Sequence, residues 1–377
     1  MNARYKLLAL DAKPGKLVKT FGNNGVVDLT QGFDRPVDTL HFETRSPPVI
    51  YKNLVMGGSH IPDWLMFEGD PPGDVRAFDV HTGERRWVFY TVPQSNDAFG
   101  ADTWQDGSWR FTGHANVWGL MSLDEQRGLL YVPTSTPSSD FWGGRRLGAN
   151  LFAESLVALD ARTGERQWHF QTVHHGLWDY DFPTAPNLLD ITIDGREIRA
   201  LAQPSKQAFT YVFDRVTGEP VWPIEERAVE TDTELEGEAL SPTQPFPTKP
   251  PPFEYQGTSI ADLVDFTPAI RAMAVEAVEN FRLGPLFSPP MLSYDGGLQG
   301  TIQRPHVGGG ASWTGASVDP ETGILYVPSE NRFSVLKYYT PAPEDGGNLR
   351  YTFPVSYTHL RAHETLRYLV CRLLLEK

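Results

Sequence analysis

The sequence is poor in several features that would narrow its class. Its 377 residues include one cysteine, Cys371, so no disulfide can form within the chain. No apolar run reaches the length of about 20 residues that a bilayer-spanning helix needs. Lysine and arginine (33) are outnumbered by aspartate and glutamate (47), giving a net charge of −14 without any basic cluster. That balance argues against nucleic acid as a partner.

Targeting and haem-binding signals are also missing from this stretch of sequence. The first residues lack the basic head, apolar segment and small-residue cleavage site of a secretory signal, and instead resemble a strand. No Cys-x-x-Cys-His haem attachment site occurs. By contrast, 34 glycines and 31 prolines are present, which indicates many turns and few long helices.

One short pattern recurs six times along the chain. It consists of an apolar strand, Asp, two or three residues, Gly, and then Trp or another apolar residue. The fullest copies occupy residues 76–87, 157–168 and 211–222, and weaker copies begin at Leu8, Met121 and Ala316. Asp can cap the backbone amides of a tight turn and Gly can adopt positive φ, so each copy predicts a β-hairpin.

Repeated hairpins of this kind predict an all-β protein, specifically a β-propeller of four-stranded antiparallel blades. A two-layer sandwich is the alternative, but it does not predict a tryptophan after each turn. We assign residues 1–354 to a partial propeller domain. Residues 355–377 are basic, contain the only cysteine and resemble translated sequencing-adapter sequence, so we interpret them as a non-native tail.

Residues 225–290 interrupt the repeats and form an excursion between blades. The segment 225–256 is acidic and then rich in proline, which predicts an extended path with polyproline II character. The segment 259–283 predicts one amphipathic helix that starts at Thr267-Pro268. The apolar residues at helical spacing are Ile270, Ala274, Val275 and Val278.

The stretch 173–181 holds two histidines, two aromatic residues and two carboxylates directly after a strand-like run. Loops at strand ends often carry reactive groups, although Trp178 could equally pack in a core while Asp179 caps a turn. Because adjacent residues of a strand face opposite sides, His174 and His175 cannot easily bind one ion. We therefore expect a structural role for these histidines.

Taken together, the repeat and the Trp-Asp-Tyr-Asp run resemble the quinoprotein dehydrogenases, especially their glucose dehydrogenase branch. The resemblance implies an eight-bladed propeller, of which this chain is a fragment, with pyrroloquinoline quinone (PQQ) and Ca²⁺ or Mg²⁺ on its axis. With the flanking repeats it covers roughly residues 40–335. The runs that carry it are 115–118, 155–160, 174–179, 205–215, 241–246 and 308–313.

The resemblance also implies roles for individual residues. Asp179 is the general base that takes the proton of the substrate hydroxyl, and it is also a metal ligand. Lys206 donates to the quinone oxygens, and Trp118 lies near the flat cofactor ring. The other residues implied at the cofactor are Thr136, Ser312 and Trp313, with Asp63 as a second acidic metal ligand.

Several positions depart from the family pattern. Thr136 stands near a position that is Asn in the alcohol dehydrogenase branch, and Ser312 replaces an Asn. Gly176 replaces a frequent Asp. Asp181 has no family role and is expected to be structural, while His114 and His306 are possible residues of the rim. These departures therefore bear on the predicted activity and not on the predicted fold.

The activity implied is oxidation of a hydroxyl of a glucose-like aldose or an alcohol, with electrons passed to ubiquinone or a cytochrome. The family further implies the periplasm, with membrane association only through a region N-terminal to this chain. The alternative is a non-catalytic propeller that serves as a binding scaffold. The two hypotheses differ in one structural expectation: only the enzyme requires Trp118, Asp179 and Lys206 to converge.

Overall fold

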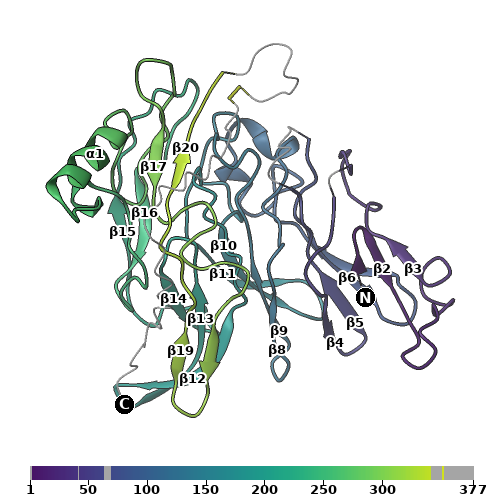
Figure 1. Cartoon of the computed structure of the whole chain (residues 1–377). Helices are drawn as coiled ribbons and strands as arrows, with labels where there is room; N and C mark the ends of the chain where they lie inside the picture. The colour runs from purple at the N-terminus through teal and green to yellow at the C-terminus, as the bar shows by residue number, and fades with distance from the viewer. Residues whose placement is uncertain (1, 41, 63–68, 341–349, 352–377) are drawn as a thin grey trace.

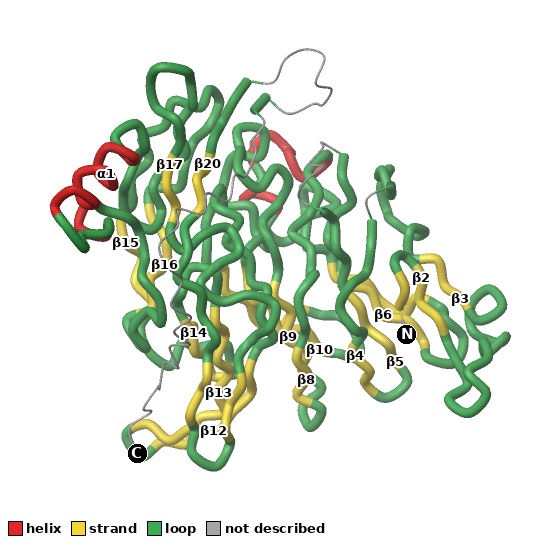
Figure 2. The backbone as a smooth tube through the Cα atoms, viewed as in Figure 1, coloured by secondary structure: helices red, strands yellow, loops and turns green. Residues whose placement is uncertain are grey.

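The computed structural model describes residues 2–40, 42–62, 69–340 and 350–351. In these residues the fold is a series of small antiparallel sheets, and the sheets from β1 to β14 stand side by side in chain order (Figure 1). Long loops connect the strands, and the one α-helix of these residues, α1 (Pro268–Val278), lies at an outer edge (Figure 2). None of the described helices is long and apolar enough to cross a membrane.

The first eleven strands form three sheets. β1, β2 and β3 make a three-stranded sheet, β4 to β7 a four-stranded sheet, and β8 to β11 a second four-stranded sheet. Their bounds are β1 (Asn2–Ala3), β2 (Lys6–Leu8), β3 (Val26–Asp28), β4 (Val49–Tyr51), β5 (Leu54–Gly57), β6 (Val75–Asp79), β7 (Arg85–Phe89), β8 (Ser122–Asp124), β9 (Leu129–Pro133), β10 (Ser155–Asp160) and β11 (Arg166–Gln171).

The remaining strands form one sheet of three and three pairs. β12, β13 and β14 are successive neighbours, and the pairs are β15 with β16, β17 with β20, and β18 with β19. Their bounds are β12 (Asn187–Ile193), β13 (Arg196–Pro204), β14 (Thr210–Asp214), β15 (Ile224–Ala228), β16 (Thr243–Pro247), β17 (Thr301–Gln303), β18 (Ser317–Asp319), β19 (Ile324–Tyr326) and β20 (Ser334–Leu336). The described residues also contain three short 3-10 helices, η2 (Ala101–Thr103), η3 (Gln105–Arg110) and η4 (Ile260–Asp262).

All six copies of the recurring pattern form the predicted turn. In each, the glycine N–H donates to the carbonyl of the aspartate at 2.7–2.9 Å, and the glycine φ lies between 66° and 79°. The aspartate side chain accepts from a backbone N–H two or three residues later, as in Asp79 with His81 and Asp160 with Arg162. The turn chemistry inferred from the sequence is therefore confirmed.

The tryptophan after the turn connects one sheet to the next. Trp87 donates from Nε1 to the carbonyl of Ala161 at 3.2 Å, and Trp168 donates to that of Arg215 at 3.1 Å. Each ring lies against a turn glycine of the following sheet, where an added Cβ would stand 2.6 Å (Gly164) or 2.7 Å (Gly218) from a ring carbon. These glycines are needed for close approach as well as for positive φ.

The hydrophobic core lies between successive sheets. One buried cluster joins β4–β7 to β8–β11, with Met56, Trp87 and Val157 among its members. A second joins β8–β11 to β12–β14 and includes Trp168 and Phe213. Sheets that pack face to face in sequence order are the arrangement of propeller blades.

Two predictions about the excursion need correction. The segment 225–256 does not have polyproline II character throughout, because β15 and β16 pair as an antiparallel ladder from Ile224↔Pro247 to Ala228↔Thr243. The helix begins where predicted, with Thr267 as N-cap accepting from the N–H of Ile270. Its burial differs from the prediction, since Val278 is the only buried residue of α1 and Ile270 is 39% exposed. Asp63 and the tail 355–377 lie outside the described residues.

Candidate functional site

A buried lysine bridges the two aspartates of the opening motif. Lys206 lies in the turn between β13 and β14, and Asp179 and Asp181 lie in the loop between β11 and β12. Nζ of Lys206 stands 2.7 Å from Oδ1 of Asp179 and 3.3 Å from Oδ2 of Asp181. All three side chains are at most 10% exposed, so their pairing occurs away from bulk water, where charge-assisted hydrogen bonds are strong.

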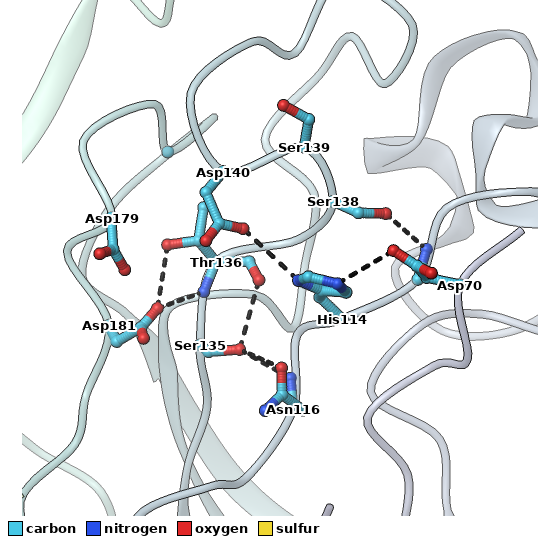
Figure 3. A network of polar contacts seen from close by, with 12 residues as sticks. Asp70, His114, Asn116, Ser135, Thr136, Ser138, Ser139, Asp140, Asp179 and Asp181 are labelled. Carbon is cyan, nitrogen blue, oxygen red and sulfur yellow. Dashed lines mark hydrogen bonds and ion pairs between the residues drawn. The ribbon is translucent and has the colours of Figure 1, made fainter. Parts of the chain in front are cut away.

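Trp118 and Thr136 complete this cluster. Trp118 donates from Nε1 to Oδ2 of Asp181 at 2.8 Å, and its ring centroid is 5.8 Å from Nζ of Lys206. Thr136 donates to Oδ1 of Asp181 from its backbone N–H at 2.7 Å (Figure 3). Trp118, Asp179 and Lys206 therefore converge, as the enzyme hypothesis requires.

Asp181, for which the sequence predicts a structural role, is the carboxylate that holds the cluster together. Burial alone would raise its pKa. The charge of Lys206 and the hydrogen bonds from Thr136 and Trp118 outweigh burial and lower the pKa of Asp181 below its ordinary value. Asp181 is thus ionised under ordinary conditions and can fix the orientation of all three neighbours.

Glu154 lies behind Thr136 and is fully buried. Burial, with the nearby charge of Asp181, raises the pKa of Glu154 to about 8. Oγ1 of Thr136 is 3.0 Å from both Oε1 of Glu154 and Oδ1 of Asp181. A hydroxyl has one proton, so a protonated Glu154 can donate to Thr136 while Thr136 donates to Asp181.

The second carboxyl oxygen of Glu154 explains one departure from the family pattern. Oε2 is buried without a hydrogen-bond partner among the described residues and lies against the backbone of Gly176. A Cβ built on Gly176 would stand 1.7 Å from this oxygen. The carboxyl group of Glu154 therefore fills the space that a side chain at position 176 would occupy.

His114 lies between two further buried carboxylates. Its Nε2 is 3.2 Å from Asp70 and its Nδ1 is 3.5 Å from Asp140 (Figure 3). Burial would lower the pKa of His114, but the hydrogen bonds with Asp140 and Asp70 prevail and raise it to about 10. With 1% exposure, His114 is not a rim residue, and that expectation was wrong. His306, at 5% exposure, is also buried rather than at a rim.

The backbone at the site is unusual for residues with side chains. Asp179, His114, Ala115 and Glu154 all have φ between 46° and 56°. Left-handed conformations cost energy in residues other than glycine, and they persist where surrounding contacts enforce them. The side chains of this cluster are therefore held in place by the packing of several loops.

Other predicted site residues are less central. Trp313 is 64% exposed, and Ser312 is half-buried with its carbonyl accepting from Gly315 N. The described residues contain no group of three or more His, Cys, Asp or Glu side chains arranged to hold a metal. His174 and His175 bind different carboxylates, Glu226 at 3.0 Å and Glu238 at 2.6 Å, as expected for neighbours that face apart.

The residues that sequence reasoning missed come from two connections, with Asp140 and Glu154 in the β9–β10 loop and Asp70 before β6. No local pattern marks them, because each is a single carboxylate in an ordinary loop sequence.

Comparison with known proteins places this chain among quinoproteins. Residues 1–363 match the family model described as "PQQ: Glucose/ethanol/alcohol dehydrogenase, beta-propeller domain". The chain is 34% identical to the quinoprotein glucose dehydrogenase of Escherichia coli, over 85% of this chain and 38% of that protein. It is 32% identical to the glycerol dehydrogenase large subunit of Gluconobacter oxydans, over 85% of this chain and 42% of that subunit.

Solved structures show the same fold. The quinohemoprotein alcohol dehydrogenase of Comamonas testosteroni superimposes with a TM-score of 0.62 at 23% identity, over 90% of this chain and 43% of that one. A europium-containing methanol dehydrogenase gives 0.61 at 21% identity, over 93% of this chain and 53% of that one. This chain thus spans about two fifths of the length of the curated relatives it matches.

Proposed function

Because the chain belongs to the PQQ family of glucose, ethanol and alcohol dehydrogenase β-propellers, we propose that it forms part of a quinoprotein oxidoreductase. Its substrate would be a hydroxyl group of a glucose-like aldose or an alcohol. The observation that carries the proposal is the buried convergence of Asp179, Lys206 and Trp118. When bound, PQQ supplies the two-electron oxidant that accepts the hydride of the hydroxyl-bearing carbon.

Asp179 is suited to remove the hydroxyl proton. Its carboxylate is 10% exposed, and its Oδ1 is held at 2.7 Å by Lys206. A general base must be oriented toward the proton that it takes, and the lysine contact together with the left-handed backbone of Asp179 supplies that orientation. Lys206 and Trp118 would hold PQQ, the first through its positive charge and the second through its aromatic face.

We propose Ca²⁺ or Mg²⁺ as the metal of this site, because the nearby side chains offer oxygen ligands. Ca²⁺ and Mg²⁺ bind carboxylate, carbonyl and hydroxyl oxygens, and the cluster offers oxygens of Asp179, Thr136 and Glu154. The unpartnered buried Oε2 of Glu154 shows that its polar capacity is not used up by the protein. We propose Asp179 and Asp63 as metal ligands, with Thr136 nearby and Ser312 and Trp313 at the cofactor.

The route of the electrons and the location follow from the same proposal. Electrons would pass to ubiquinone or a cytochrome, and the protein would work in the periplasm. The relatives include glucose, glycerol and quinate dehydrogenases, so sugars, polyols and cyclic alcohols are the substrate classes to test first. The eight-bladed ring is likewise proposed for the whole protein.

Reconstitution tests the proposal directly. The full-length protein is incubated with PQQ and Ca²⁺, and reduction of an artificial electron acceptor is followed with glucose, glycerol and quinate. We expect reduction that needs both additions and one of the substrates. Failure of the intact protein to bind PQQ would favour the non-catalytic scaffold instead.

A further inference from the structure

A single buried carboxylate of the excursion joins the two loops that carry the site. Glu238 lies between β15 and β16, and its side chain is 0% exposed. Its Oε1 is 2.6 Å from Nε2 of His175, and its Oε2 accepts from the backbone N–H of Gly143 at 2.7 Å. His175 belongs to the β11–β12 loop (172–186) and Gly143 to the β9–β10 loop (134–154).

These two loops bring the site residues together. The β9–β10 loop carries Thr136 and Glu154, and the β11–β12 loop carries Asp179 and Asp181. They meet at the hydrogen bond from the Thr136 N–H to Asp181. Any shift of one loop against the other would therefore change the position of Asp179 relative to the rest of the cluster.

Two further hydrogen bonds connect the same two loops close to Glu238. Arg146 donates from a guanidinium nitrogen to the carbonyl of Gly176 at 2.7 Å, and Nδ1 of His175 lies 2.9 Å from the carbonyl of Gly148. Both ring nitrogens of His175 thus face oxygen atoms, the carbonyl of Gly148 on one side and the carboxylate of Glu238 on the other. Glu238 is the only one of these two partners that is a carboxylate.

The excursion also contacts the β11–β12 loop through Gln244. The side chain of Gln244, which is 0% exposed, accepts from the His174 N–H and donates to the His174 carbonyl, both at 2.8 Å. Leu235 packs in one cluster with Phe141 and Trp142 of the β9–β10 loop. The buried face of the excursion is therefore built around these two loops.

We propose that Glu238 is a positioning residue, which holds the β11–β12 loop against the β9–β10 loop and so sets the position of Asp179. Two residues of the β11–β12 loop, His175 and Asp179, have φ of 52° and 55°, and such conformations need external contacts to persist. Burial would raise the pKa of Glu238, but His175 and the Gly143 N–H lower it, which keeps the carboxylate charged. The consequence for turnover rests on the proposed function, while the coupling of the loops does not.

The first test measures the loops themselves. Glu238→Gln keeps the size of the side chain and an acceptor for Gly143 but removes the charge opposite His175. Glu234→Gln, an exposed residue of the same excursion, is the matched control. In the full-length protein without added cofactor, we expect faster backbone hydrogen exchange in residues 138–146 and 172–181 for Glu238→Gln alone. Unchanged exchange in both loops would overturn the coupling.

The second test measures turnover for each PQQ-loaded site. We expect Glu238→Gln to lower kcat by about 10-fold or more with little change in KM, because a catalytic group displaced by about 1 Å can cost about 100-fold. His175→Gln should lower kcat similarly, and the double variant should be no worse than the worse single variant. A purely structural role would instead reduce the number of loaded sites with kcat per site unchanged, and independent, multiplying effects would contradict the shared link.

A third variant covers the case in which Glu238→Gln does not fold. Glu238→Asp keeps the charge but is one methylene shorter, so it cannot reach both Gly143 and His175, and it should show the same two effects. If the loops respond to Glu238 but the wild-type protein never reduces an acceptor, the proposed function fails and the coupling stands. If the wild-type protein turns over and substitution of Glu238 leaves kcat unchanged, the positioning role is contradicted and the proposed function is not.

Discussion

At the scale of single residues, Glu154 and any side chain at position 176 would compete for the same space. The carboxyl group of Glu154 lies where a side chain at position 176 would begin, and Glu154 itself has the left-handed φ of 46° that glycine adopts readily. The two positions should therefore respond to substitution as a pair rather than separately.

We predict that Gly176→Ala lowers the free energy of unfolding by about 1–3 kcal/mol, the usual cost of overpacking a filled interior. In a Glu154→Gly background the same substitution should cost clearly less, because the colliding carboxyl group is gone. Urea unfolding of the wild type, both single variants and the double variant measures this. Additive costs would show that the two residues do not compete for space.

The central pairing of the site illustrates what sequence can and cannot show about residues. Asp179 and Lys206 are 27 residues apart in sequence, and only the family resemblance indicated that they meet. The position of Asp181 relative to Asp179 could not be predicted, because a spacing of two predicts a shared face only on an extended strand. The left-handed backbone of Asp179 bends the loop instead, and that bend has no sequence signal.

At the scale of elements, each repeat tryptophan can be tested for its link to the next sheet. Trp87→Phe and Trp168→Phe remove an indole hydrogen bond to the following turn. We predict a loss of about 1 kcal/mol or more in the free energy of unfolding for Trp87→Phe, since the buried carbonyl of Ala161 is left unpaired. The loss for Trp168→Phe should be smaller, because Tyr131 also donates to the carbonyl of Arg215, at 2.9 Å. Trp222→Phe is the control. Gly323 is the turn glycine of the next repeat, and a Cβ added there would have no neighbour within 4 Å among the described residues, so Trp222 does not pack against it. Equal losses at all three positions would contradict this account.

Asp124 links neighbouring sheets and should make stability depend on pH. It pairs with Arg127 at 2.9 Å and with Arg215, beyond β14, at 3.0 Å. Burial opposes ionisation, but these two arginines lower the pKa of Asp124 below 3.8. A lowered folded pKa adds stability above the unfolded value that is lost as the pH falls through the folded value.

We therefore predict that Asp124→Asn destabilises the protein at neutral pH and that its difference from wild type shrinks below about pH 4. Unfolding curves at pH 7, 5 and 3 measure this difference. A gap that stays constant over this range would show that the charge of Asp124 contributes nothing to folding.

The sequence predicted the turns that contain Asp and Gly, but it did not predict strand β16, which contains proline. The six Asp-Gly turns were all predicted. β16 was missed because Pro245 and Pro247 suggested an extended, unpaired path. Proline is tolerated in this strand because β16 has a partner, β15, on only one side.

At the scale of the whole molecule, the site depends on how successive sheets and the excursion meet. Trp118 precedes β8, Thr136 follows β9, Asp179 follows β11 and Lys206 follows β13, so four connections supply one cluster. The repeat pattern could predict a propeller, because it recurs locally. It could not predict which loops converge, because that depends on the packing between sheets and on long-range contacts such as the one from Glu238.

The measurement that tests the account most directly compares Asp179→Asn with wild type in the full-length protein. Asp194→Asn, in an exposed turn between β12 and β13, is the control. PQQ binding is titrated and acceptor reduction is measured on the same samples. If Asp179 is the base, Asp179→Asn should bind PQQ nearly as well as wild type while kcat falls by about 100-fold or more. Turnover at the wild-type rate by Asp179→Asn would contradict the assignment of the site.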